Sequence, residues 1–444
     1  MKKFDVVIIG AGPGGIESAL QARQYGLSTL LITGSKLGGR AVWGSLVPSK
    51  VWLTVAEKMD DLRNMHLQGL LVEDISIDME VIKERINLQS TKTSQRYFQQ
   101  LQNAGVIIEH GQAVLKDEHN VRLTCADETI LDYFGEYIIV STGSEPHFLP
   151  SLKPDGKHII APRHTAALEE IPSSLVIAGG GISGLEYGYA FAALGAEVTI
   201  IQRNHQLLPG FDPAIVRQYQ THLEQRNNIH FLTGHAVESM HWNEDDGVET
   251  KIGNGSLLYT EVGLIAMGRK ADLAFCDPAA LNLALTPQGF LAINAFQQTS
   301  QPNIYAVGDV TGDPMMANKA IWEARKAIRH INCSQVDYSP PLMEAVFTQP
   351  PLVQIGQLST HPHHVVELPL HTLLKGQLTG KEEGILRIYL KEDQRIEAAA
   401  GFGLYLPEIM AVIQTAIQKD IPFNQLKLVP FGYPSATEIL TSSI

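Results

Sequence analysis

A glycine-rich motif that occurs twice, each time between an apolar run and a helical segment, constrains the fold more than any other feature. The apolar runs are FDVVIIG at 4–10 and SLVIAG at 174–179. Runs that are apolar throughout suit parallel strands that are buried on both faces. The glycines are Gly10, Gly12, Gly14 and Gly15 in the first copy and Gly179, Gly181 and Gly184 in the second.

Each glycine of a GxGxxG motif has its own physical task. The first allows a tight turn, the second lets the backbone approach a pyrophosphate, and the third lets the helix pack close to the strand. The N-terminus of the helix then offers free N–H groups to the phosphates. One such motif can be an ordinary glycine-rich turn, but two copies in this setting predict two dinucleotide-binding domains.

Size and charge exclude several classes of partner. The chain has 444 residues, of which 44% are apolar, and a net charge of −13. This suits a soluble globular protein of two or three domains. Because an acidic surface repels phosphate backbones, we expect no nucleic-acid partner. No apolar run reaches the ~18 residues of a membrane-spanning helix, so we expect no membrane insertion.

The cysteines indicate a reducing compartment. Cys125, Cys276 and Cys333 lie far apart, without CxxC spacing. This pattern excludes a disulfide scaffold and favours the cytoplasm. The segment HPHHVVELPLH at 361–371 could bind a metal, but its spacing matches no zinc template, so we predict no metal site.

Two later stretches predict further parts of the fold. TSQPNIYAVGDVTG at 299–312 is an apolar strand that leads into Gly308 and Asp309. An Asp at the carboxyl end of a strand lies where α/β sheets bind ligands, although Asp309 could equally be a helix N-cap. After the two prolines at 340–341, the alternating run LRIYL and the helical run LPEIMAVIQTAIQ predict an α+β domain with an antiparallel sheet.

Several motifs together resemble a known family. GAGPGG, GGxxxxxxxxPSK, STGSEP, GGGISGLE, AMGR, YAVGD and VFTQPP occur in the order found in pyridine nucleotide-disulfide oxidoreductases, such as dihydrolipoamide dehydrogenase, glutathione reductase and mercuric reductase. The resemblance implies an α/β fold with two Rossmann-like domains, for FAD and for NAD(P), and a C-terminal α+β dimerisation domain. It places the FAD domain at 1–150 and 268–335, the NAD(P) domain at 151–267 and the interface domain of a homodimer at 336–444.

The chain departs from this family at its reaction centre. The redox helix of the family, GGTCLNVGCIPSK, aligns so that the two cysteines fall on Ala41 and Leu46. The C-terminal motif HPTxxE aligns with Tyr433 and Glu438, so that tyrosine replaces the histidine base. Only a thiolate attacks a disulfide, and a phenol with a pKa near 10 cannot replace imidazole at neutral pH. We therefore expect no dithiol–disulfide chemistry.

Other functional residues of the family are present. Lys50 matches the lysine beside the reactive nitrogen of the flavin, and Glu186 matches its ion-pair partner, although such a pair could also be a surface salt bridge. The resemblance implies FAD contacts from Gly10, Gly12, Gly14, Gly15, Thr33, Gly38, Gly39, Lys50, Thr142, Gly143, Gly308 and Asp309. It implies NAD(P) contacts from Gly179, Gly181, Gly184, Glu186, Gln202, Arg203 and Gly268.

The positions of the ribose-binding acids bear on the cofactors. This acid lies about 20 residues after the first glycine of the motif, which here gives Thr33 and Gln202. Arg203 follows Gln202 and suits a 2′-phosphate, so NADPH is favoured over NADH, although an Arg at a strand end is often simply solvated. Thr33 makes weaker bonds to a ribose than a carboxylate, so FAD affinity is expected to be lower than in relatives.

These observations predict an FAD-dependent NAD(P)H oxidoreductase that passes electrons from the flavin to a small non-disulfide acceptor, preferably a quinone. Ala41, Leu46 and Trp43 would line its pocket, and the partner subunit's Tyr433 would donate a hydrogen bond there. One alternative is a non-catalytic descendant that binds a nucleotide or a partner protein. Another is disulfide chemistry with a cysteine borrowed from a partner protein or cosubstrate.

Overall fold

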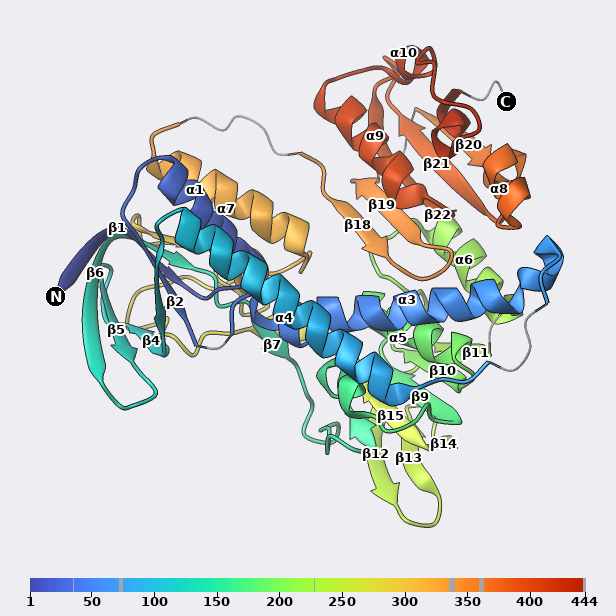
Figure 1. Ribbon diagram of the computed structural model, residues 1–444, viewed down its shortest axis with the longest axis horizontal. Coiled ribbons are helices and arrows are strands. Elements are labelled where there is room, and N and C mark those ends of the chain that lie inside the picture. Colours follow the sequence, from blue (N-terminus) through green and yellow to red (C-terminus); the bar gives the residue numbers. More distant parts are fainter. Residues whose placement is uncertain (35, 72–74, 227, 335–339, 359–362, 442–444) are drawn as a thin grey trace. The chain divides into compact units, whose positions relative to one another are not determined.

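A computed structural model describes residues 1–444 except 35, 72–74, 227, 335–339, 359–362 and 442–444 (Figure 1). The chain divides into two compact units, each built from three segments. The first unit contains Met1–Pro48, Lys83–His147 and Gly268–Ser339, and the second contains Ser49–Ile82, Phe148–Met267 and Pro340–Ile444.

A seven-stranded sheet forms the centre of the first unit, in the order β3-β2-β1-β6-β5-β4, with β17 paired to β6. Strands β1, β2, β3, β6 and β17 are parallel, and β4 and β5 extend the sheet in antiparallel pairing. Their bounds are β1 Lys2–Ile9, β2 Thr29–Thr33, β3 Ile107–His110, β4 Gln112–Leu115, β5 Asn120–Thr124, β6 Ile130–Val140 and β17 Ile304–Ala306. A short pair, β7 Ser144–Pro146 and β16 Arg269–Ala271, lies outside this sheet.

Burial on both faces explains why the second half of β1, from Val6 to Ile9, is apolar throughout. Val6 and Ile8 belong to one buried cluster, and Val7 and Ile9 belong to another. Successive side chains of a strand point to opposite faces, so each face of β1 has its own core. Helices α1 Pro13–Gln24, α2 Gly39–Trp43, α4 Met79–Asn103 and α7 Ala317–Ile331 and the 3₁₀ turn η3 Gly308–Thr311 complete the main elements of this unit.

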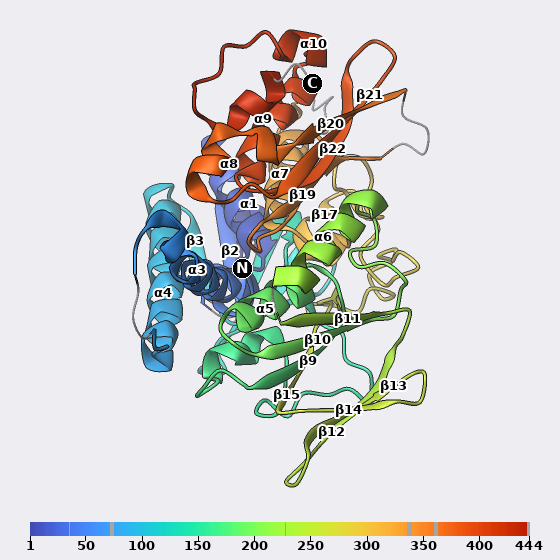
Figure 2. The same ribbon diagram turned by 90° about the vertical axis from the view of Figure 1, so that its right-hand side faces the viewer.

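The second unit contains another parallel sheet, in the order β11-β10-β9-β15-β8, whose main strands lie side by side in Figure 2. The strands are β8 Ile159–Ile160, β9 Ser174–Ala178, β10 Glu197–Gln202, β11 Ile229–Thr233 and β15 Val262–Ile265. Helices α3 Leu46–Arg63, α5 Ile182–Ala193 and α6 Pro213–Arg226 and the 3₁₀ turns η1 Met65–Gln68 and η2 Pro162–Ala167 accompany them. An antiparallel sheet of β12 Val237–Asn243, β13 Gly247–Ile252 and β14 Leu257–Thr260 follows β11.

The C-terminal part of the second unit is an antiparallel sheet in the order β18-β19-β22-β21-β20. Its strands are β18 Met343–Val346, β19 Leu352–Gly356, β20 His364–Pro369, β21 Gly384–Leu390 and β22 Ile396–Gly403. Helix α9 Leu406–Gln418 packs its buried face on this sheet, and η4 Leu370–Thr372, α8 Leu374–Thr379, α10 Phe423–Leu426 and η5 Ala436–Thr441 surround it. The predicted fold class, two Rossmann-like sheets and a C-terminal α+β part, is confirmed.

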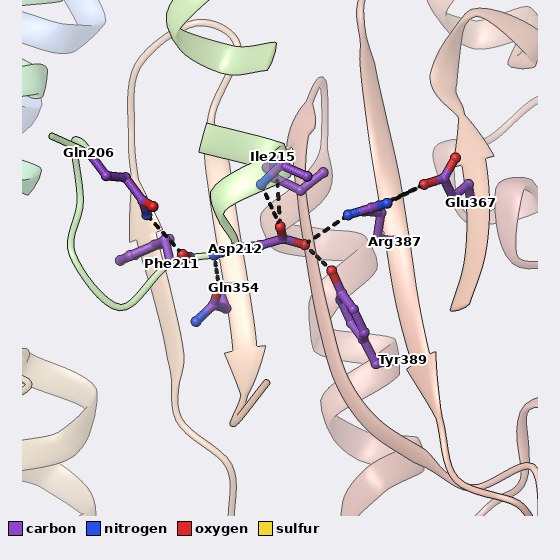
Figure 3. Close-up of polar contacts among 9 residues, drawn as sticks. Gln206, Phe211, Asp212, Ile215, Gln354, Glu367, Arg387 and Tyr389 are labelled. Atoms are coloured by element: carbon purple, nitrogen blue, oxygen red, sulfur yellow. Dashed lines mark hydrogen bonds and ion pairs between the residues drawn. The ribbon is translucent and has the colours of Figure 1, made fainter. Parts of the chain in front are cut away.

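A buried polar network within the second unit joins the start of α6 to the C-terminal sheet (Figure 3). The Asp212 carboxylate accepts hydrogen bonds from two backbone N–H groups at the start of α6, at 2.8 and 3.4 Å, and from the Tyr389 hydroxyl. Arg387 lies 3.5 Å from the same carboxylate and also binds Glu367. The Asp212 N–H donates to Gln354 at 2.8 Å. A buried carboxylate with several donors fixes this connection, because each donor would otherwise lose a partner.

Candidate functional site

The glycine-rich loop of the first unit leaves the N-terminus of α1 open. A Cβ on Gly10 would lie 2.3 Å from the carbonyl oxygen of Ser141, and a Cβ on Gly15 would lie 1.9 Å from that of Gly10, so neither position tolerates a side chain. Gly12, the N-cap of α1, has no neighbouring atom within 4 Å of its Cβ position. The loop is thus closely packed against the sheet and open in front of the helix, and it fits the phosphates of a dinucleotide.

Helix α2 begins against this loop. The Gly38 N–H donates to the Ala11 carbonyl at 2.9 Å, and a Cβ on Gly39 would lie 3.2 Å from the Cα of Gly12. Both glycines have positive φ, 96° and 56°, which favours residues without a side chain. The helix ends at Trp43, and α3 begins at Leu46, so the predicted redox helix is interrupted around Gly44.

A second group of side chains in the first unit surrounds Asp309. The Ser144 hydroxyl donates to the Asp309 carboxylate at 2.6 Å, and the Arg269 guanidinium lies 3.8 Å from it. Arg269 also donates to the Ser144 hydroxyl and carbonyl oxygens, each at 2.7 Å. Val307 is the N-cap of η3, so the alternative role of Asp309 as a helix N-cap is wrong, because Asp309 lies inside the turn and its carboxylate faces Ser144.

The backbone next to Asp309 is also fixed. Gly308 has φ 82° and donates its N–H to the buried Glu323 carboxylate at 2.7 Å. On the neighbouring β6–β7 connection, Gly143 has φ 78° and the Thr142 hydroxyl donates to the Asp272 carbonyl at 2.7 Å. These residues form a preorganised edge of the sheet, where open α/β sheets bind ligands.

A pocket of about 540 Å³ lies at the end of β2, beside Thr33. Lys36, His110, Gln112 and Cys125 are among its lining residues, and none of the described lining residues is acidic. A dinucleotide bound on the loop would extend its ribose toward the end of the second strand, which is where this pocket lies. Thr33 itself is 2% exposed.

The glycine-rich loop of the second unit repeats this geometry. A Cβ on Gly179 would lie 2.4 Å from the Ala266 carbonyl oxygen, a Cβ on Gly184 would lie 1.9 Å from that of Gly179, and Gly181 is open at the N-cap of α5. The Gln202 side chain accepts a hydrogen bond from the Gly180 N–H at 3.1 Å, so it stabilises the loop from within. Arg203 is exposed. Gly268, with φ 106°, precedes β16 in the first unit.

Lys50 and Glu186 form a close ion pair within the second unit. The Lys50 ammonium on α3 lies 2.7 and 2.8 Å from the two Glu186 oxygens on α5. Glu186 is 4% exposed and also accepts the Phe347 N–H at 3.1 Å, and the Phe347 ring lies 4.6 Å from the ammonium. The alternative of a surface salt bridge is therefore wrong, because the carboxylate is buried and accepts three hydrogen bonds, two from the Lys50 ammonium and one from the Phe347 N–H.

The positions of the family's thiol chemistry carry no sulfur. Ala41 is half-buried in α2, and Leu46 is 41% exposed at the start of α3. All three cysteines of the chain are free. Tyr433 is 75% exposed, and the Glu438 Oε2 atom is buried without a hydrogen bond from any residue that the structure describes.

Among the described residues, no group of three His, Cys, Asp or Glu side chains could hold a metal ion. His361 of the histidine-rich segment lies outside the described residues, and Glu367 is paired with Arg387. No helix in the described part of the chain is long and apolar enough to cross a membrane.

Sequence reasoning did not assign several residues of the site. Arg269 stands in the AMGR motif, and Ser144 in STGSEP, but only the fold shows that both reach Asp309. Phe347 stands in VFTQPP, and its contacts with Glu186 and Lys50 again depend on pairing between distant segments. Trp43 is held by its own loop, since its indole N–H donates to the Leu37 carbonyl at 3.0 Å and Lys36 covers its ring.

Comparisons with known proteins agree with this geometry. A family model described as pyridine nucleotide-disulphide oxidoreductase matches residues 4–324. Dihydrolipoyl dehydrogenase of Chlorobaculum tepidum is 32% identical over 359 residues, which cover 80% of this chain and 76% of that protein. Dihydrolipoyl dehydrogenase 2 of Haloarcula marismortui is 28% identical over 451 residues, covering 98% and 94%.

Solved structures share the fold over the whole length. The crystal structure of LpdA from Mycobacterium tuberculosis has a TM-score of 0.91 at 24% identity and covers 99% of this chain and 98% of that one. The HOCl-induced flavoprotein disulfide reductase RclA from Escherichia coli has a TM-score of 0.85 at 23% identity, with 98% of each chain covered.

Proposed function

Because this chain belongs to the pyridine nucleotide-disulphide oxidoreductase family, we propose that it is an FAD enzyme that oxidises NADPH and reduces a quinone-like acceptor directly, without a disulfide. In the overall reaction, NADPH, one proton and a quinone give NADP⁺ and a quinol. FAD, when bound, accepts a hydride from NADPH and releases electrons to the acceptor.

The observation that carries this proposal is that Lys50 is paired with the buried carboxylate of Glu186, while Ala41 and Leu46 stand at the two cysteine positions. The Glu186 carboxylate holds the Lys50 ammonium in one position, and the Phe347 N–H fixes the carboxylate in turn. A fixed positive charge of this kind would stabilise negative charge that develops on a flavin bound next to it. Without sulfur, electrons have no carrier between the flavin and the acceptor.

The chain's own residues would hold FAD along the first unit. The loop Gly10–Gly15 and the start of α2 at Gly38 and Gly39 would bind its phosphates, and Asp309, held by Ser144 and Arg269, would bind the flavin side. The pocket beside Thr33 would receive the adenosine part. We assign 1–150 and 268–335 to FAD binding and 151–267 to NAD(P) binding.

For the nicotinamide cofactor, we favour NADPH over NADH. Gln202 is engaged with the Gly180 N–H, and the next residue, Arg203, is exposed at the end of β10. A guanidinium at this place suits a 2′-phosphate better than a ribose hydroxyl. Replacing Arg203 with Glu should raise the KM for NADPH by about tenfold or more and leave that for NADH within about twofold, as measured by steady-state reduction of a quinone.

We also assign residues 336–444 to the interface of a homodimer in the cytoplasm. The exposed Tyr433 on this part supports a contact with a second copy, in which the partner subunit's Tyr433 donates a hydrogen bond to the acceptor. An acceptor pocket formed by Ala41 and Leu46 is apolar in character, which suits a quinone ring.

Anaerobic titration tests the proposal. NADPH should reduce the bound flavin, and a quinone should reoxidise it, while lipoamide and glutathione disulfide should not be turned over. A protein that cannot be loaded with FAD would favour a non-catalytic descendant that binds a nucleotide or a partner. Disulfide turnover by the chain alone would contradict the assignment of Ala41 and Leu46, and turnover only with an added thiol protein would indicate a borrowed cysteine.

A further inference from the structure

Glu323 on α7 carries a buried charge next to the turn that contains Asp309. The side chain is 5% exposed, and its carboxylate accepts the Gly308 N–H at 2.7 Å. The preceding N–H, that of Val307, still donates to the Val140 carbonyl of the neighbouring strand β6 at 2.9 Å. The carboxylate thus takes over from the sheet as the hydrogen-bond acceptor at Gly308. Because a buried N–H without an acceptor is costly, this contact fixes the direction in which the chain leaves the sheet.

A second buried charge, Lys319, lies one turn earlier on α7 and holds the other end of η3. Its ammonium is 3.5 Å from the Glu323 carboxylate and donates to the Gly312 carbonyl at 2.6 Å and to the Thr311 hydroxyl at 2.8 Å. The Thr311 hydroxyl donates in turn to the Gly308 carbonyl at 2.8 Å. Two charged side chains of one helix therefore bind the start and the end of the same short turn.

Stability alone does not explain this buried pair. Moving two charges out of water costs free energy that their attraction only partly returns, and packed apolar residues often stabilise a fold equally well. Burial raises the pKa of Glu323, against the effects of the Lys319 charge and the Gly308 N–H, so desolvation is the largest influence on this carboxyl. Charged groups do provide strong, directional hydrogen bonds to the backbone, which apolar residues cannot. The pair is therefore suited to holding η3 in one conformation.

The same turn of α7 also supports the phosphate-binding loop. Helices α1 and α7 pack side by side in the first unit (Figure 1). Ala320 follows Lys319, and its carbonyl oxygen lies 3.4 Å from the position of a Cβ on Gly14 of α1. The Ala320 Cβ lies 3.3 Å from the position of a Cβ on Gly308. The start of α7 is thus packed against both the helix behind the loop and the turn that contains Asp309.

We propose that Glu323 and Lys319 are positioning residues for FAD, which hold η3 so that Asp309 can bind the flavin part of the cofactor. They act through the backbone of Gly308 and Gly312 and not through contacts of their own with the cofactor. The inference rests on the proposed function in taking FAD as the cofactor and Asp309 as one of its contacts. It implies that loss of the Glu323 charge weakens binding of the flavin half of FAD and spares the half that contains ADP.

Calorimetric titration of the full chain, freed of flavin, tests this assignment. FAD and ADP are titrated into the wild type and into Glu323→Gln, which keeps the size of the side chain and an acceptor oxygen but removes the charge. ADP occupies the phosphate-binding loop but has no flavin half. The variant should lose about tenfold to a hundredfold in affinity for FAD and stay within about twofold of the wild type for ADP.

A double-variant cycle shows whether Glu323 acts through Asp309. Asp309→Asn alone should weaken FAD binding by about tenfold or more, because a charged contact to the flavin side is lost. Once Asp309 has no charge to place, adding Glu323→Gln should weaken FAD binding by less than about twofold further. The same calorimetry measures both steps of the cycle.

Melting temperatures of the flavin-free proteins separate positioning from stability. In Glu323→Gln the Lys319 ammonium loses its buried counter-charge, so the melting temperature should fall. In the double variant Lys319→Met and Glu323→Gln neither charge is buried, so the melting temperature should return toward the wild-type value. FAD affinity of the double variant should nevertheless stay about tenfold or more below that of the wild type, because η3 is no longer held.

A matched control is available on the same helix. Arg325 on α7 lies 2.6 Å from Glu17 on α1, so this ion pair joins the two helices rather than α7 and η3. Glu17→Gln removes a carboxylate charge from a partner of α7, as Glu323→Gln removes one from α7 itself. It should leave the affinities for FAD and for ADP within about twofold of the wild type.

Equal affinity of the wild type and Glu323→Gln for FAD would overturn the proposal. An equal loss of ADP affinity would also overturn it, because the effect would then be a general disturbance of the first unit. A full additional loss in the Asp309→Asn background would show that Glu323 does not act through Asp309. If the affinities behave as expected but NADPH does not reduce the bound flavin, the proposed function fails while the assignment of Glu323 and Lys319 stands.

Discussion

Two glutamates of the second unit, Glu186 and Glu438, have opposite surroundings. Glu186 is buried and held by the Lys50 ammonium at 2.7 Å and the Phe347 N–H at 3.1 Å. Glu438 has a buried oxygen to which no described residue donates, and Tyr433, which replaces its histidine partner, is 75% exposed. Glu186 thus has the contacts that the proposed hydride transfer requires, while Glu438 has no described donor at its buried oxygen. Four substitutions test this contrast.

Removing the charge of Glu186 should have the largest effect. Glu186→Gln takes both charged contacts from Lys50, so the rate of flavin reduction by NADPH should fall about 100-fold or more. The free energy of unfolding should fall by about 1–2 kcal/mol, less than for a fully buried pair, because Lys50 is one-third exposed. Anaerobic stopped-flow absorbance and urea denaturation measure the two quantities. An unchanged rate would show that the pair is only structural.

Changing Phe347 should have an intermediate effect. Phe347→Leu keeps the backbone N–H that binds Glu186 but removes the ring 4.6 Å from the Lys50 ammonium. A cation–π contact at a partly exposed site contributes about 0.5–1 kcal/mol, so flavin reduction should slow by about two- to fivefold. The same stopped-flow assay measures this rate. A decrease in the rate as large as that of Glu186→Gln would mean that the ring itself has another role.

Removing the Tyr433 hydroxyl should slow only the transfer of electrons from the flavin to the acceptor. Because this side chain is exposed, Tyr433→Phe should change the free energy of unfolding by less than about 0.5 kcal/mol. Loss of one neutral hydrogen bond to the quinone should slow flavin reoxidation by about fivefold, while reduction by NADPH stays at the wild-type rate. Double-mixing stopped flow separates the two steps, and an equal slowing of both would argue against this role.

The smallest effect is expected at Glu438. Glu438→Gln removes a charge whose buried Oε2 has no donor among the described residues, so the protein should be unchanged or more stable by up to about 0.5 kcal/mol. Quinone reduction should remain at the wild-type rate. Glu438→Gln is the matched control for Glu186→Gln. A comparable loss of activity in both variants would remove the contrast between the two glutamates.

Much of the architecture could be predicted because it depends on local sequence. Apolar runs with glycine-rich turns specify the two parallel sheets, and alternation in LRIYL specifies an antiparallel strand. These features follow from periodicity and from the steric demands on single glycines, such as Gly15 against Gly10. The Lys50–Glu186 pair was predicted in another way, from the resemblance to the family in whose motifs both residues stand.

The remaining features depend on contacts between distant segments. Asp309 follows a strand, which suits both an N-cap and a ligand-binding position, and only its contact with Ser144 decides between them. Gln202 occupies the position of a ribose acid, yet its side chain binds the Gly180 N–H.

The most direct test of the central claim is an anaerobic titration of the FAD-loaded protein with NADPH, followed by addition of a quinone or of lipoamide. The account predicts that NADPH bleaches the visible absorbance of the flavin, that the quinone restores it fully and that lipoamide leaves it bleached. Reoxidation by lipoamide, or a flavin that neither NADPH nor NADH reduces, would contradict the account.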